Sequence, residues 1–173
     1  MPIISYRPRV TKIDPALLER ARPFLVAHPL PAAVPADSAA LAVACQTASI
    51  AAGFSQIQIQ GLPGGLLRVE GSDGLGRGLI SEIQNAKGEL RLATEVTGIR
   101  DGSCRAVMER FDAALEKEGI VSPPPRRKWT GGVAELAAAK AFLQRTAARR
   151  AEAERRRTER ARRLNAAVTK QTR

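Results

Sequence analysis

Apolar positions recur every three to four residues in two early stretches of the chain, which predicts two amphipathic helices. The first is expected to begin at Asp14-Pro15, with proline in the first helical position, and to end near His28-Pro29. The second follows the proline-rich segment 29–38, with Asp37 or Ser38 as its N-cap. The predicted inward side chains are Leu17, Leu18, Ala21, Phe24 and Leu25 in the first helix and Leu41, Ala44, Cys45 and Ala48 in the second.

The hydrophobic period shortens to two after Gly53, which predicts two β-hairpins. Gln and Ile alternate in FSQIQIQ, residues 54–60, and the turn GLPGG joins this segment to residues 66–70. A second pair connects LISEIQ with ELRLATEVT across residues 85–88, although its first half is less regular and is also compatible with a helix. One-sided alternation of this kind is typical of an antiparallel sheet with one covered face.

A third amphipathic helix is expected from about Ser103, and Gly119 is expected to end it. Its apolar stripe comprises Cys104, Val107, Met108, Phe111 and Leu115. The helices would cover the apolar face of the sheet. The sequence therefore predicts an α+β domain with a four-stranded antiparallel sheet, made of two hairpins and packed by about three helices, followed by a long C-terminal basic helix.

The segment KGELRLATEVTGIRDGSCRAVMERFDAALEKEG, residues 87–119, resembles a small uncharacterised bacterial family. In that family a strand ends in a Gly-x-x-Gly-x-Ser-Cys-like turn and leads into an amphipathic helix. Asp101 stands here at the position of the family's second glycine. The resemblance covers about a fifth of the chain. It implies a strand–turn–helix unit and no function.

The positive charge is confined to the C-terminal part of the chain. The 173 residues carry a net charge of +11, yet residues 1–125 contain 13 basic and 13 acidic side chains, whereas residues 126–173 contain 15 and 4. We therefore divide the chain into an α+β domain (1–122), a Pro/Gly linker (123–132) and an Arg-rich helical arm (133–173). A neutral domain with a basic arm is typical of a protein that binds a polyanion.

The sequence gives no sign of a membrane or secreted protein. It contains no run of about 18 apolar residues. The opening segment, MPIISYRPRVTKID, lacks an apolar stretch of signal-peptide length. Cys45 and Cys104 lie among apolar residues, which favours reduced core thiols over a disulfide framework. We therefore expect a cytoplasmic protein.

Two features are candidates for chemistry. Cys104 stands beside Arg105 at a helix N-terminus, where a thiol can become nucleophilic, but His28 is the only histidine and the thiol falls on the apolar stripe. We interpret it as a core residue. The glycine-rich loop 71–78, with Arg77, could cradle phosphate, yet it matches neither P-loop nor dinucleotide-binding spacing, so we interpret it as a turn. We expect no enzymatic activity, no cofactor and no metal site.

The arm presents arginines in a row. At 100° per residue, five of them fall within roughly 60° of one another along about 27 Å of helix. A guanidinium group binds phosphate through two hydrogen bonds, which favours nucleic acid as the partner. The row comprises Arg145, Arg149, Arg156, Arg160 and Arg163. A short apolar stripe of Val133, Leu136, Ala137 and Leu143 is expected to dock the start of the arm on the domain.

Trp129 has three interpretations: it stacks on a base, fills a pocket of a partner, or covers the core of its own domain. We expect a non-catalytic protein, within a larger complex, whose arm contacts the phosphate backbone of RNA or DNA with little sequence specificity. The alternative is a subunit or adaptor whose arm docks on an acidic protein surface. A solvated helix without a partner is a third option, and a membrane surface is disfavoured because the arm has no apolar face. The predicted nucleic-acid contacts are Arg126, Arg127, Lys128, Trp129, Arg145, Arg149, Arg150, Arg156, Arg157, Arg160 and Arg163.

Overall fold

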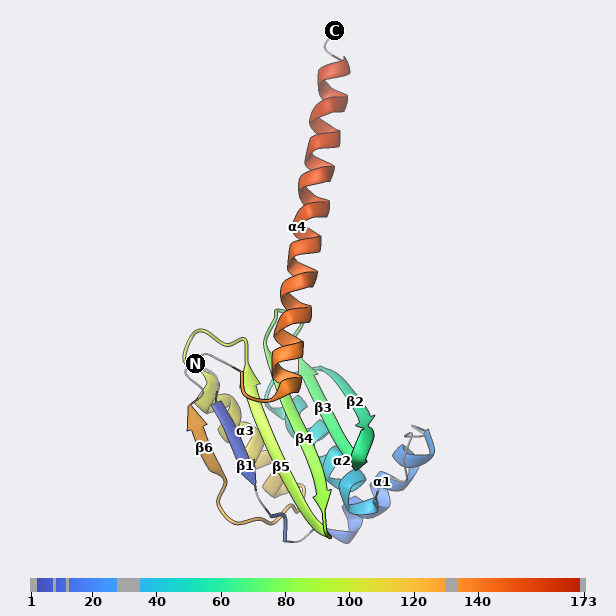
Figure 1. Cartoon of the computed structure of the whole chain (residues 1–173), viewed down its shortest axis with the longest axis vertical. Coiled ribbons are helices and arrows are strands. Elements are labelled where there is room, and N and C mark those ends of the chain that lie inside the picture. The colour runs from blue at the N-terminus through green and yellow to red at the C-terminus, as the bar shows by residue number, and fades with distance from the viewer. Residues whose placement is uncertain (1–2, 8, 12, 28–34, 130–133, 172–173) are drawn as a thin grey trace.

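The computed structural model describes residues 3–7, 9–11, 13–27, 35–129 and 134–171 (Figure 1). It shows an antiparallel sheet with helices on both faces and a long C-terminal helix that extends away from the sheet. The elements are β1 (Ile3–Arg7), α1 (Pro15–Ala27), α2 (Ala36–Ala51), β2 (Gln56–Leu62), a 3-10 turn η1 (Pro63–Gly65), β3 (Leu66–Ser72), β4 (Gly78–Ala86), β5 (Glu89–Thr97), α3 (Cys104–Lys117), β6 (Arg126–Trp129) and α4 (Ala137–Gln171).

The described part of the sheet has six strands in the order β2-β3-β4-β5-β1-β6, and every neighbouring pair is antiparallel. Both predicted hairpins are present as β2–β3 and β4–β5, and the first half of the second is a strand, not a helix. The prediction of four strands was wrong, because β1 and β6 extend the sheet beyond β5. These strands have five and four residues, too few to show a period in the sequence.

The main core lies between the sheet and the helices of one face. There α2 contacts β3 and β4, α3 contacts β1 and β5, and α1 packs on α2. The predicted inward residues of the second and third helices are all buried, which confirms both apolar stripes. The strand–turn–helix unit that the family resemblance implied is also present, as β5 followed by α3.

The first two helices differ from expectation in detail. Within α1, Leu17 and Ala21 are buried and Leu18 is half-buried. The side chains of Phe24 and Leu25, and the predicted end at residues 28–29, lie outside the described part of the chain. The N-cap prediction for α2 was wrong: Pro35 precedes the helix without a side-chain cap, Asp37 lies in the first turn and Ser38 is buried.

A second, smaller core lies on the opposite face of the sheet, under the start of α4 (Figure 1). Gly78 leaves room for the ring of Phe142, since a Cβ atom at this glycine would lie 2.6 Å from the ring carbon Cε1. The predicted docking of the arm is therefore confirmed, and its stripe in part: Leu136 and Leu143 pack against this core, Ala137 is exposed, and Val133 lies outside the described residues. The buried members are Ile80, Ala134, Ala138, Ala139 and Phe142, with Leu136 and Leu143 partly buried against them.

The rest of α4 leaves the body of the protein. Residues 151–169 are exposed on every side of the helix, which Figure 1 shows as a straight rod beyond the ends of the strands. Within the described residues, no helix is both long enough and apolar enough to cross a membrane.

Candidate nucleic-acid interface

The start of α4 is fixed to the sheet by a buried acid. The carboxylate of Glu95, in β5, accepts hydrogen bonds from the backbone amides of Glu135 at 2.9 and 3.1 Å and of Leu136 at 2.7 Å. These amides belong to the two residues that immediately precede α4, next to the helix N-terminus, where backbone N–H groups lack helical acceptors and the helix dipole favours negative charge. Burial raises the pKa of Glu95, although the two amides oppose this shift. A carboxylate of the sheet thus acts as the N-terminal cap of the arm.

Two further side chains hold the same segment from the other strands. The Tyr6 hydroxyl of β1 donates to Glu135 Oε2 at 2.9 Å, and Lys128 Nζ of β6 donates to Glu135 Oε1 at 2.5 Å. The hydrogen bonds from Lys128 and then Tyr6 lower the pKa of Glu135. The arm is therefore attached through charges as well as through its small apolar core.

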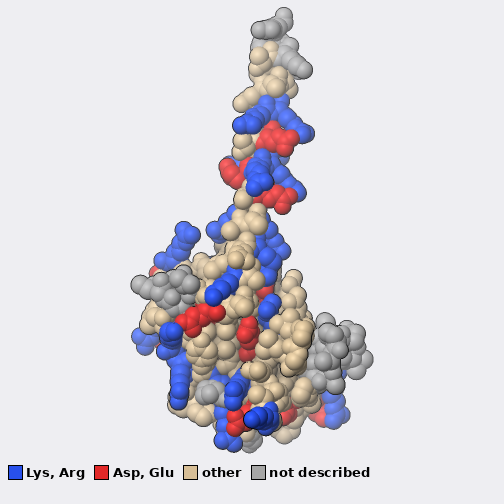
Figure 2. Space-filling view, viewed as in Figure 1, with Lys and Arg blue, Asp and Glu red and all other residues tan. Residues whose placement is uncertain are grey.

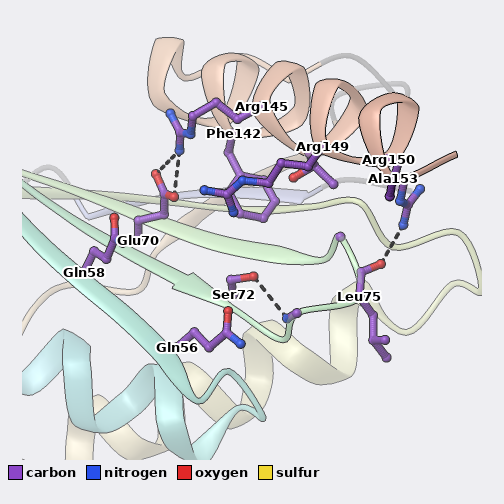
Figure 3. A pocket seen from close by; sticks show the side chains of 13 residues that line it. Gln56, Gln58, Glu70, Ser72, Leu75, Phe142, Arg145, Arg149, Arg150 and Ala153 are labelled. Atoms are coloured by element: carbon purple, nitrogen blue, oxygen red, sulfur yellow. Dashed lines mark hydrogen bonds and ion pairs between the residues drawn. The ribbon is translucent and has the colours of Figure 1, made fainter. Parts of the chain in front are cut away.

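One turn beyond the core, Arg145 bonds to the sheet. Its Nη2 donates to both carboxylate oxygens of Glu70, at 2.7 and 2.6 Å (Figure 3). Glu70 lies in β3, opposite Gln58 of β2 and Ile80 of β4. Arg145, the first arginine of the predicted row, is thus engaged with the protein itself.

A groove of about 550 Å³ opens beside this ion pair, between α4, the edge of the sheet and the loop after β3 (Figure 3). Its volume is within the range of small-molecule sites. Arginine and glutamine side chains line it from opposite sides: α4 supplies Arg145, Arg149 and Arg150, and β2 supplies Gln56 and Gln58. Because Glu70 is the only acid among its lining residues, the groove carries an excess of positive charge.

The glycine-rich loop 71–78 closes one end of this groove and is held by its own acid. Asp73 Oδ1 accepts from the amides of Leu75 at 2.8 Å and Arg77 at 3.1 Å, and its carboxylate also pairs with the Arg77 side chain. Burial raises the pKa of Asp73, but these bonds outweigh it and leave the pKa below its usual value. Since Asp73 occupies the amides that a phosphate would use, the structure favours the interpretation as a turn. Arg150 Nη2 donates to the Leu75 carbonyl at 2.6 Å, which ties the loop to α4.

The projecting part of α4 carries most of the predicted contacts. Figure 2 shows basic and acidic side chains together along this rod. Arg156 pairs with Glu152 and Arg163 with Glu159, each four residues along the helix. These exposed pairs are worth about 0.3–0.5 kcal/mol each, so they support the helix more than they neutralise it. Among the described residues, Arg157 and Arg160 make no ion pair.

Residues 126–129, which the sequence analysis placed in the linker, form the edge strand β6. Two of its three cations bind acids of the protein. Arg127 Nη2 lies 2.5 Å from Asp112 Oδ2, whose other oxygen is 2.7 Å from Arg7, and Lys128 binds Glu135 as described above. Arg126 is exposed and has no ion pair among the described residues.

Trp129, the last residue of β6, is 55% exposed. The interpretation that it covers the domain's own core was therefore wrong, because this side chain lies at the end of an edge strand and more than half of it is exposed. An exposed indole is available for stacking or for a partner's pocket, the two interpretations that remain.

Both cysteines lie inside the protein. Cys45 and Cys104 are both free and fully buried, and burial raises the pKa of the Cys45 thiol to about 12. Across the described residues, no three His, Cys, Asp or Glu side chains are grouped to hold a metal ion.

The acids that bind the arm could not be recognised from the sequence. Glu95 and Glu70 occupy outward positions of alternating strands, where a charged residue normally marks solvent exposure. Only the packing of α4 on that face turns them into partners. The apolar stripe at the start of the arm was the only feature of the sequence to indicate that the face of the sheet with Glu70 and Glu95 is partly covered.

Comparisons of the chain with protein-family models, curated proteins and solved structures give no match. The resemblance of residues 87–119 to a bacterial family accordingly stays a prediction.

Proposed function

We propose that the protein binds the phosphate backbone of nucleic acid through α4, with little sequence specificity and without catalysis. The observation that supports this most is the contrast within the helix: its start is fixed to the sheet, whereas residues 151–169 are exposed on every side. These residues contribute to neither core of the protein, yet they hold arginines along one continuous helix. Such a helix suits phosphate contacts, which fix position and do not read bases.

The charge of the helix favours a polyanion. Residues 149–163 contain eight arginines and three glutamates. Two of the glutamates pair with Arg156 and Arg163, which leaves several arginines, Arg157 and Arg160 among them, without an acid partner in the described part. Guanidinium groups bind phosphate bidentately and are more weakly hydrated than ammonium groups. Arg149 and Arg150 extend this positive surface down to the groove.

The test uses the full chain and a chain shortened after Arg150, which keeps every described contact between α4 and the sheet. Both are titrated with short RNA and DNA, single-stranded and duplex, over a salt series. We expect the full chain to bind with a steep linear fall of log K against log salt, and the shortened chain to bind more weakly with a shallower slope. Circular dichroism must show that the shortened chain keeps its sheet. Failure of the full chain to bind any of these polymers at low salt would refute the proposal.

A second candidate is a subunit of a protein assembly whose arm docks on an acidic protein surface. The observation that favours it is the tip of α4, where Leu164 and Val168 are 59% and 61% exposed and lie four residues apart, on one side of the helix. Nucleic-acid backbone offers little to such a pair, whereas a protein groove does. Replacing both by alanine should leave polymer affinity unchanged under the first proposal and abolish partner binding under this one. A cytoplasmic location, where both thiols remain reduced, fits either candidate.

A further inference from the structure

The β2 strand (Gln56–Leu62) forms one edge of the sheet. It pairs with β3 on one side, and in the described part of the chain no strand pairs with its other side. An edge strand presents a row of unpaired backbone N–H and C=O groups, and proteins usually protect such an edge with charge, proline, a bulge or a very short strand.

None of these protections is present in β2. Residues 38–67 contain no charged side chain, and proline comes only after the strand, at Pro63. The pairing with β3 runs one to one from Gln56 opposite Ser72 to Leu62 opposite Leu66, so the strand has no bulge. The opposite edge differs, because β6 has only four residues and three of them are cationic. The open edge of β2 is therefore suited to pairing with another strand.

The strand is also complementary to itself. Residues 56–60 read Gln-Ile-Gln-Ile-Gln in both directions. If two copies pair antiparallel with Gln58 opposite Gln58, then Ile57 meets Ile59 and Gln56 meets Gln60. Every glutamine faces a glutamine and every isoleucine an isoleucine. Glutamine side chains both donate and accept hydrogen bonds, and β-branched pairs stabilise neighbouring strands.

The two faces of the strand agree with this arrangement. Gln56 and Gln58 line the groove under α4, whereas Ile57 and Ile59 are half-buried against the main core. A two-fold axis perpendicular to the sheet places the helix-covered faces of both copies on the same side of the joined sheet. The isoleucines of both β2 strands would therefore lie on that face. The same axis reverses the strand direction. Because α4 extends beyond one end of the strands (Figure 1), the two arms would point in opposite directions.

We propose that the protein is a homodimer in which the β2 strands of two copies pair antiparallel about Gln58, joining two six-stranded sheets into one. A self-complementary, uncharged strand favours a second copy over a different partner, since an isologous contact requires the same surface to match itself. The dimer does not depend on nucleic-acid binding.

The first test is the mass of the full chain by light scattering and sedimentation, with a matched pair of variants. We expect twice the mass of one chain. Gln58→Lys places two cations opposite each other and should weaken the dimer at least about tenfold. Gln84→Lys, at an exposed position of the central strand β4, is the control and should leave the mass unchanged. Mixing Gln58→Lys with Gln58→Glu should restore a dimer.

The second test fixes the register. Opposite residues in an antiparallel pair lie about 4.5–5.5 Å apart between Cα atoms, within disulfide range, so Gln58→Cys should cross-link two chains under mild oxidation. Gln60→Cys should not cross-link the two chains. In this register residue 60 faces residue 56 of the other copy, so the two introduced thiols would be four residues, or about 14 Å, apart along the strands. The native cysteines are buried and provide a low background. A monomeric chain at about 0.1 mM, a dimer unaffected by Gln58→Lys, or equal cross-linking at both positions would overturn the proposal.

Discussion

The carboxylate of Glu95 lies 2.7 Å from the backbone nitrogen of Leu136, so that an acid near the C-terminal end of β5 holds the residue immediately before the 35-residue helix α4. Glu95 is fully buried and Leu136 is half-buried, so the sheet and the start of the arm are joined at a largely buried point. An N-cap normally comes from the residue just before the helix. Here the acceptor comes from a strand residue 41 positions away along the chain.

Replacing Glu95 should loosen the arm. Glu95→Ala leaves the amides of Glu135 and Leu136 without an acceptor in a partly buried site, and we expect a loss of about 1–3 kcal/mol in the free energy of unfolding. Glu95→Gln keeps an acceptor oxygen and should lose less. Urea unfolding measures the loss, and hydrogen exchange at the first turn of α4 locates it. Equal stability of Glu95→Ala and the unchanged chain would contradict this role.

Burial of Glu95 should also make stability depend on pH. Its pKa is raised above the ordinary 4.5 by desolvation, so the folded state binds a proton that the unfolded state has already lost. The stabilisation that protonated Glu95 gives to the folded state is therefore fully present below the pKa of the unfolded chain. It declines as pH rises from about 4.5 through the higher pKa of the folded state. We expect the free energy of unfolding of the unchanged chain to fall over this window relative to Glu95→Gln. If the free energy of unfolding changes with pH in the same way in both proteins, the pKa of Glu95 is not raised.

Tyr6 reports on the same attachment through its absorbance. It is the only tyrosine, and its pKa is raised to about 12 by burial, by its hydrogen bond to Glu135 and by the negative charge of that group. The folded state thus favours the phenol, and this stabilisation is lost as pH rises from about 10 to about 12. Ultraviolet titration should give the raised value in the full chain and a lower one in Glu135→Gln. A titration near 10 in the native protein would mean that the bond to Glu135 does not form in solution.

Gly78 and Phe142 should behave as a coupled pair. A methyl group at residue 78 would meet the ring, so Gly78→Ala should cost about 1–3 kcal/mol through overpacking. In a Phe142→Ala background the same change should cost little, because the ring is gone. A double-mutant cycle by thermal unfolding measures this coupling. Additive effects would mean that the ring does not rest on the glycine.

The arginines of α4 should differ in their contribution to polymer binding. Arg157→Gln with Arg160→Gln removes cations that have no acid partner among the described residues, and we expect a clear loss of affinity and a reduction of the salt slope by about two. Arg145→Gln removes a cation already bound to Glu70 and should change affinity less. Filter binding or fluorescence anisotropy at several salt concentrations compares them. The reverse order would place the binding surface at the groove and not along the rod.

Secondary structure followed closely from the sequence, because the period of apolar residues is a local property of the chain. The Gln-Ile alternation of β2 and the stripe from Cys104 to Leu115 of α3 were both readable in this way. The strands β1 and β6 were not, since five and four residues hold no repeat and their pairing depends on segments far away in sequence.

The candidate site likewise has features that follow from the local sequence and features that depend on tertiary packing. The sequence by itself determined that the positive charge lies in a C-terminal helix and that the start of this helix docks on the domain, because charge counts and apolar spacing are local. Only the tertiary structure decided which cations are engaged within the protein. Arg127, Lys128 and Arg145 meet Asp112, Glu135 and Glu70. Opposite charges attract across space whatever their separation in the chain, so their pairing appears only when the sheet and α4 are packed together.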